Sequence, residues 1–536
     1  MNKILYAVAR CLLVATTMLS VSCKDFLIEE PVNSTYSEAF WKSSRDLSSA
    51  LAGNYALVRS VISSGNGGGP RYFMYGDAVA RYYFTLQYTG DGLEGIQTGD
   101  YTFQYNVESF GDWRGYYKAV TMSNIILNRV PKIDNALLTD LANPEKFKNE
   151  IMGEAYFLRA LVYFMMVRNW GDVPIVTEEY EDPISAPELA RSPKAEVMAL
   201  IEADCKKALE LLDWNYTSLG DAKVTANKGS VEALLAHLYL WRATTTDVTT
   251  DQPNMQDVLA AETAIDAITT NGMYSQTDTA NYYSTFIGKS REGIFEIAIN
   301  DDVREGSNAH IGNMFLRTSH IQYYGTNSRA YVNLDYFSDH FYKFDKVWNW
   351  YWNATIGQWE WREGDVKVVD DKDVRLRKNF TDMATDRPTC IKYSNVSYRN
   401  TAQNQDAYLS NNIIIFRLSD MLLLKAEIAL YKGNTLAAIN IINSFRTRNG
   451  ADPTAMLPTT LSKDEVLYEY ALERGKEMYL EGHLMYDLIR TRQYANFVSW
   501  LSESRFRQEG FYWPVSPDLF RNNNKLTQTT YWRGKV

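Results

Sequence analysis

The strongest constraint on the fold is a long helical pattern of apolar residues at 150–170. Two neighbouring stripes recur there at helical spacing: Ala155, Leu158, Val162 and Met165, and beside them Phe157, Leu161 and Phe164. An apolar arc this wide is typical of a helix that is packed on two sides, as inside a stack of helices. Gly171 and then Pro174 end the pattern. We therefore predict a mainly α-helical protein.

Further helical patterns occur on both sides of a different middle region. They predict a helix that begins at Pro193, capped by Ser192, and helices at 228–243, 255–269, 418–431, 435–448, 462–480 and 483–493. Ser462 and Glu465 form a capping box, which marks a helix start. Helices of this length with short breaks favour a scaffold of helix pairs stacked in tetratricopeptide style, although the repeat of roughly 34 residues is not clean.

The middle of the chain, residues 271–415, lacks long helical stripes and is rich in Tyr, Trp, Asn, Asp and Gly. Short strands are predicted at 293–299 and 413–416. We interpret this span as a large irregular insert of loops and short strands, supported by helical regions at 23–270 and 416–536. Residues 63–112 form a second loop-rich segment, and long loops in a folded protein usually serve function.

Residues 1–22 have the pattern of a secretory lipoprotein signal. Lys3 and Arg10 precede an apolar run at 11–21, which is shorter than the about 20 residues needed to span a bilayer. Cys23 follows Leu-Ser-Val-Ser, which resembles a bacterial lipobox, in which the new N-terminal cysteine is acylated. The alternative is ordinary secretion with Cys23 merely nearby. We expect a lipid anchor at Cys23 and a fold that begins after residue 22.

Charge and cysteine content narrow the class of protein. The formal net charge of −10 argues against nucleic acid or anionic lipid as partners. Of the four cysteines, only Cys205 and Cys390 lie beyond the signal and the expected anchor, too few for a disulfide framework. The sequence contains no second long apolar run that would predict a transmembrane helix.

Several segments, in their order and spacing, resemble the SusD/RagB family of surface lipoproteins from Gram-negative bacteria. They include Gly-Glu-Ala-Tyr-Phe-Leu-Arg at 153–159 and Trp-Gly-Asp-Val-Pro at 170–174. The others lie at 23–31, 228–236, 417–427, 473–488, 512–517 and 524–528. The resemblance implies a tetratricopeptide-like scaffold with a binding face built from loops and no catalysis or cofactor. It also implies a lipid-anchored place on the outer-membrane surface, beside a SusC-like TonB-dependent transporter that receives the nutrient.

Tryptophan is concentrated in one segment, since five of the 13 lie in residues 348–361. Their alternating spacing places side chains on one face of a strand, and residues 353–357 can turn the chain into a hairpin. Flat aromatic faces suit the apolar face of a pyranose, so the candidate glycan-binding residues are Trp348, Trp350, Trp352, Trp359 and Trp361. The alternative is that these indoles form a mini-core under the insert or pack on the transporter.

A second candidate lies in the aromatic segment 71–88, which follows a glycine-rich loop at 65–69. That loop lacks the Gly-Lys-Ser/Thr of a phosphate-binding loop. The family resemblance implies that N-terminal loops help to form the ligand site, so Arg81, Tyr82 and Tyr83 are further candidates, with buried packing as the alternative for each.

The sequence contains little that is typical of a catalytic or metal-binding site. The five histidines are scattered without zinc-ligand spacing. His483 lies within a family-like helix motif and is interpreted as structural. A calcium ion at Asp365, Asp370, Asp371 and Asp373 is possible but unsupported, because the spacing is not that of an EF-hand and a solvated turn is favoured. The expected function is therefore glycan binding and delivery; the alternatives are a RagB-like peptide-binding protein and a surface glycoside hydrolase.

Overall fold

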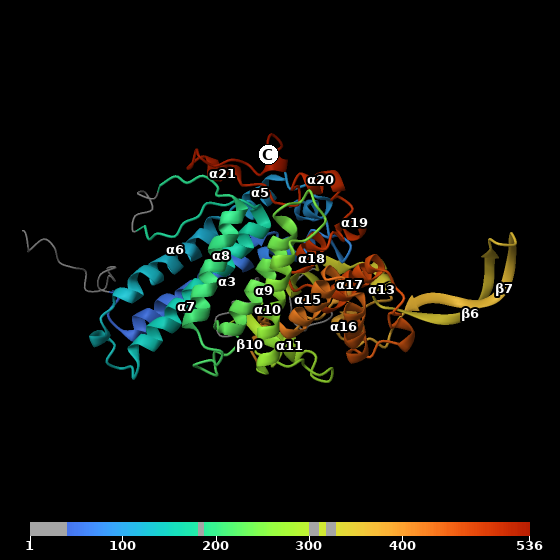
Figure 1. Cartoon of the computed structure of the whole chain (residues 1–536), viewed down its shortest axis with the longest axis horizontal. Coiled ribbons are helices and arrows are strands. Elements are labelled where there is room, and N and C mark those ends of the chain that lie inside the picture. Colours follow the sequence, from blue (N-terminus) through green and yellow to red (C-terminus); the bar gives the residue numbers. More distant parts are fainter. Residues whose placement is uncertain (1–39, 181–186, 300–309, 318–327) are drawn as a thin grey trace, which may run out of the picture.

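The computed structural model describes residues 40–180, 187–299, 310–317 and 328–536. Helices form the body, and one long hairpin projects from its side (Figure 1). The mainly α-helical prediction is confirmed. The signal at 1–22 and the anchor residue Cys23 lie outside the described residues. Within the described residues, no helix combines the length and apolarity that a membrane crossing requires.

The N-terminal half of the body is a stack of long helices in which successive members pack together. They are α3 (Ser44–Ser63), α6 (Arg114–Arg129), α7 (Pro144–Trp170), α8 (Lys194–Leu211), α9 (Lys228–Thr245) and α10 (Met255–Asn271). The C-terminal helices are α15 (Leu418–Tyr431), α16 (Thr435–Arg448), α17 (Lys463–Glu477) and α18 (Leu484–Arg490). Because α10 packs on α15, the two halves form one continuous stack.

Local capping sets the ends of these helices. Asn143 caps α7 by accepting a hydrogen bond from the amide of Lys146, so α7 begins six residues before the predicted start. Gly171 ends it with a φ of 68°. Helix α17 stops at Glu477 rather than near 480, and Leu480 has a φ of 57°, which a helix cannot contain. Both stripes of α7 are buried, as predicted.

Two long helices, α3 and α6, are not among the predicted ones. Glycine, asparagine and serine lie inside both, and these residues favour a helix weakly. The two helices pack against each other, and both contact α7. Burial against neighbouring helices therefore stabilises α3 and α6, for which local helix propensity alone is too weak.

The strands form six two-stranded antiparallel sheets within the described residues. The two predicted strands of the insert are confirmed, and they pair with each other as β4 (Gly293–Ile297) and β12 (Ile413–Arg417). Four further short pairs are β1 (Gly65–Asn66) with β2 (Gly69–Pro70), β3 (Phe84–Leu86) with β5 (Ala330–Val332), β8 (Phe380–Thr381) with β9 (Thr389–Cys390), and β10 (Val396–Asn400) with β11 (Gln405–Leu409). Short helices connect them, including α13 (Leu334–His340) and α14 (Val374–Asn379).

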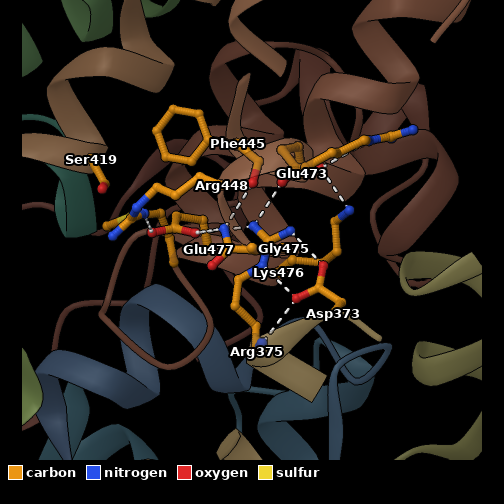
Figure 2. A network of polar contacts seen from close by, with 12 residues as sticks. Asp373, Arg375, Ser419, Phe445, Arg448, Glu473, Gly475, Lys476 and Glu477 are labelled. Atoms are coloured by element: carbon orange, nitrogen blue, oxygen red, sulfur yellow. Dashed lines mark hydrogen bonds and ion pairs between the residues drawn. The ribbon is translucent and has the colours of Figure 1, made fainter. Parts of the chain in front are cut away.

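A buried network of ion pairs fastens the insert to the C-terminal helices (Figure 2). Arg375 of α14 contacts Glu473 at 2.7 Å and Glu477 at 3.0 Å, both on α17. Arg417 of β12 contacts Glu477 at 2.9 Å and Glu292 at 2.7 Å. Burial alone would raise the pKa of Glu473, but neighbouring cations, Arg375 above all, lower it to about 2. Glu473 is therefore ionised and serves as a structural partner.

Candidate ligand-binding surface

The tryptophan segment forms the predicted hairpin. Strand β6 (Tyr342–Asn353) pairs in antiparallel register with β7 (Gln358–Val369). Trp350 lies opposite Trp361, and Trp352 lies opposite Trp359. Gly357, with a φ of 64°, closes the turn by donating its amide to the carbonyl of Asn353 at 2.8 Å. The hairpin extends away from the helical body (Figure 1).

All five indoles share one face of this hairpin. Residues two apart in a strand point to the same side, and directly opposed residues do as well. The two cross-strand pairs have ring centroids 5.6 Å apart, with the planes inclined by 60° and 65°. Each indole is 54–62% exposed: Trp348, Trp350, Trp352, Trp359 and Trp361. A mini-core under the insert is therefore wrong, because the chain leaves more than half of each indole open to solvent.

Polar groups border the indole face without giving the hairpin a net charge. Toward the base of the hairpin, Glu363 lies opposite Trp348, and Lys346 pairs with Asp365 at 2.8 Å. Residues 342–369 contain four cations and four anions, so the surface does not favour an ionic ligand of either sign. An aromatic face with a polar border is suited to an uncharged ligand that has both apolar and hydroxyl surfaces.

The second candidate region forms a cavity of about 370 Å³ on the body. Its lining includes Arg81, Tyr82, Asn333, Asn496, Phe497 and Trp500. The hydroxyl of Tyr82 donates to Asp339 of α13, the helix that directly precedes the hairpin. Burial, and then the Asp339 carboxylate, raise the pKa of Tyr82, so the phenol stays protonated.

Two further residues of this cavity, Asn333 and Trp500, are not among those predicted from the sequence. Asn333 donates its amide to the carbonyl of Tyr82 at 3.0 Å, and Trp500 donates its indole N–H to the carbonyl of Val79 at 2.9 Å. Both lie hundreds of positions from Tyr82 in the chain. No local pattern links them, so only folding brings them together.

Tyr83 does not belong to this cavity. Its side chain is fully buried, and its ring lies within 5.8 Å of the rings of Tyr336 and His340. The alternative of buried packing describes Tyr83, and we do not carry it forward as a ligand contact. Arg81 and Tyr82 remain candidates.

One cluster within the described residues has donor atoms close enough for a metal, namely His237, Asp420 and His483. Other contacts already occupy these atoms. His237 Nε2 lies 2.6 Å from Asp420 Oδ2, and Arg474 donates to Asp420 Oδ1 at 2.6 Å. Burial lowers the pKa of His483 to about 4, and its Nε2 lies 3.1 Å from the carbonyl oxygen of Ile415. The cluster fits a structural role, as expected for His483.

The acidic run at 365–373 is only partly the solvated turn that we favoured, since Asp365 and Asp371 are exposed but Asp370 and Asp373 are not. Asp370 and Asp373 are each 1% exposed. Asp370 accepts the amide of Asp452 at 2.6 Å, and Asp373 caps α14 while it pairs with Arg375 at 2.8 Å. Asp365 pairs with Lys346 on the hairpin, and within the described residues the four aspartates do not form a group close enough to hold a metal.

Comparison with known proteins identifies related sequences along almost the whole chain. A family model described as starch-binding and associating with the outer membrane matches residues 82–240, and a SusD family model matches residues 271–532. The SusD-like protein P38 of Formosa agariphila is 22% identical over 542 residues, covering 95% of each chain. A SusD-like protein of Bacteroides ovatus is 27% identical over 243 residues, 44% of this chain and 40% of that protein.

Solved structures share the fold. A SusD homolog from Bacteroides thetaiotaomicron superposes with a TM-score of 0.72 at 23% identity, covering 92% of this chain and 100% of that one. Bacteroides fragilis NanU gives a TM-score of 0.64 at 21% identity, covering 93% and 99%. At this identity the likeness establishes the architecture, while the ligand is a separate question.

Proposed function

Because the chain belongs to the SusD/RagB family, we propose that it is a cell-surface protein that binds glycan and delivers it to a SusC-like TonB-dependent transporter in the outer membrane. In this proposal the protein binds and transfers its cargo without cleaving it. Curated relatives carry SusD-like names, and one matching family model is described as starch-binding. These findings support a role in nutrient uptake.

The observation that carries the glycan assignment is the single exposed face of indoles on the hairpin. Each of its five tryptophans is more than half exposed. Aromatic faces contact the C–H face of a pyranose, and bordering groups such as Glu363 and Lys346 can bond its hydroxyls. The balanced charge of the hairpin favours a neutral glycan over a strongly acidic one. Arg81 and Tyr82 are proposed as a second ligand contact on the body.

Binding assays on the mature chain, residues 23–536, test this function. Affinity gels and calorimetry against a panel of polysaccharides are expected to show retardation and saturable heat for at least one neutral glycan. A peptide library run in parallel addresses the RagB-like alternative, and binding to peptides alone would replace glycan as the cargo.

The same panel separates binding from hydrolysis. We expect no growth of reducing ends during long incubation with a bound polysaccharide. Sustained release that disappears on substitution of one carboxylate would support the glycoside hydrolase alternative, because glycosidases act through placed carboxyl groups.

The membrane role rests on Cys23 and on a partner transporter. Cys23→Ala is expected to release the protein from the membrane fraction while its thermal unfolding stays unchanged. Retention of this variant in a strain that lacks the transporter would argue against the lipid anchor. Co-purification of the neighbouring TonB-dependent transporter in mild detergent tests the partner, and recovery of the protein alone, with the transporter expressed, would argue against it.

A further inference from the structure

A second cavity, of about 470 Å³, lies between α3, α7 and the loop that joins α8 to α9. These helices lie on the side of the body away from the hairpin (Figure 1). The walls are largely apolar and aromatic, formed by Leu51, Tyr55, Phe147, Ile151, Leu212 and Tyr216. A largely apolar cavity of this size that also contains polar groups is the usual form of a small-molecule site.

Glu154, one of the four carboxylates that line this cavity, has no cationic partner among the described residues. Glu154 of α7 accepts a hydrogen bond from the hydroxyl of Tyr55, whose oxygen in turn accepts the amide of Ala226 at 2.9 Å. Among the described residues, no lysine or arginine forms an ion pair with Glu154. Lys146 instead pairs with Asp213 at 3.1 Å and with Glu150 at 3.7 Å. The carboxyl of Glu154 therefore has no cation beside it that would stabilise its ionised form.

Titration of Glu154 agrees with this geometry. Burial raises its pKa to about 7, against the lowering effect of the Tyr55 hydroxyl and the Ala226 amide, and Glu150 adds to the rise. A cation beside the carboxylate would favour its ionised form. Binding of such a cation would therefore release a proton near neutral pH.

We propose that this cavity binds a small primary ammonium ligand with an apolar body, whose cation pairs with Glu154. The ammonium group would supply the missing counter-charge, since a nearby cation stabilises the ionised form of a partly buried carboxyl. The rings of Tyr55 and Tyr216 line the same space, and aromatic faces attract cations. The apolar walls would pack against the apolar body of the ligand. This proposal does not rest on glycan binding at the hairpin.

Calorimetry on the mature chain with three probes tests the chemistry. Phenethylammonium is expected to bind, whereas its anionic counterpart 3-phenylpropionate is not, and glucosamine, an ammonium on a polar body, is expected to bind more weakly. Equal or tighter binding of the anion would overturn the proposal. Equal or tighter binding of glucosamine would overturn the requirement for an apolar body and point to an amino sugar.

The pH dependence adds an independent readout. Phenethylammonium affinity is expected to rise between pH 5 and 8 as Glu154 ionises, with proton release that varies the measured heat between buffers. The other titratable groups that face the cavity are Tyr55, Glu150, Asp213, Tyr216 and Asp221. Affinity that falls over this range would contradict the assignment.

Two variants and a control isolate Glu154. Glu154→Gln keeps an acceptor for the Tyr55 hydroxyl but removes the charge. We expect it to bind phenethylammonium about tenfold more weakly, because it loses one charge-assisted hydrogen bond. Glu210→Gln, an exposed glutamate on α8 that pairs with Lys207 at 2.8 Å, should bind like the unaltered chain. Unchanged affinity in a folded Glu154→Gln would overturn the proposal.

A steric variant keeps the test decisive if Glu154→Gln does not fold. Ala52 lines the cavity from an exposed position on α3, so Ala52→Phe fills the space without entering the core. Loss of phenethylammonium binding with an unchanged thermal melt is expected. Full binding by Ala52→Phe would show that the probe sits elsewhere and would overturn the site.

Discussion

Trp350 and Trp361 lie directly opposite each other on the hairpin, with ring centroids 5.6 Å apart and planes inclined by 60°. Cross-strand aromatic pairs of this kind stabilise a sheet by about 0.2–1 kcal/mol each. Each ring nevertheless remains more than half exposed. The pair therefore helps to hold an arm that has little contact with the body, and it still leaves aromatic surface free for a ligand.

Trp350→Ala is expected to weaken glycan binding by about 1–3 kcal/mol, the cost of a lost aromatic hot spot. The melting temperature should barely change, because the indole lies outside the core. Calorimetric titration and a thermal melt measure both effects. Asn349→Ala, on the opposite face of the same strand, is the matched control and should retain affinity. Unchanged affinity for Trp350→Ala would move the proposed site to the cavity at Arg81 and Tyr82.

Arg417→Met should destabilise the protein strongly. Removing this cation leaves Glu292, Glu477 and Glu481 with an uncompensated buried charge. Breaking a buried pair from one side costs about 3–5 kcal/mol. Urea unfolding measures the loss. The control is Lys346→Ala in the solvent-exposed pair with Asp365, which should not shift the curve; equal effects would argue against the structural role of the network.

The stability of the fold should fall with rising pH because of Asp77. Burial raises the pKa of Asp77 to about 8, against the lowering effect of hydrogen bonds from the amides of Gly482 and Leu484. A carboxyl whose folded pKa lies above its unfolded value of about 3.9 binds more protons in the folded state between these values. Its contribution is complete below about pH 4 and is lost as the pH rises through 8.

Melts of the unaltered chain and Asp77→Asn at pH 5 and pH 8 measure this effect. The neutral amide cannot ionise, so the variant should lose less stability over the interval than the unaltered chain. Equal slopes would show that Asp77 is ionised throughout. Below pH 4 the opposite sign applies to Glu473, whose lowered pKa of about 2 means that its contribution is lost as the pH falls.

Gly482→Ala should cost more stability than Gly433→Ala. Both glycines have left-handed backbone, with φ of 80° and 76°. A Cβ on Gly433 meets no atom within 4 Å, so only the backbone penalty of about 1–2 kcal/mol applies. A Cβ on Gly482 would lie 2.3 Å from Cε1 of Tyr72, which is buried and cannot move freely. Chemical unfolding compares the two variants. Equal losses of unfolding free energy would mean that the Tyr72 side chain moves aside.

Much of the scaffold could be predicted from local signals. The predicted ranges 418–431 and 435–448 agree with α15 and α16 at both ends. Gly433 separates these helices, and Asn434 caps the second by accepting the amide of Ala437. The tryptophan hairpin was predictable for the same reason, since strand alternation and a short turn act within a few residues.

The candidate site depended on the tertiary structure. Tyr82 and Tyr83 are neighbours with the same side chain, yet one lines a cavity and the other is fully buried. Tyr82 owes its position partly to Asp339, 257 positions away. The exposure of the tryptophans was equally undecided, because alternation fixes which residues share a face but not what covers that face. Local sequence patterns predicted most of the long helices and the hairpin turn, since these depend on contacts within a few residues, whereas α3 and α6 needed tertiary packing. Burial and convergence arise from contacts between distant residues, so only the folded chain decided them.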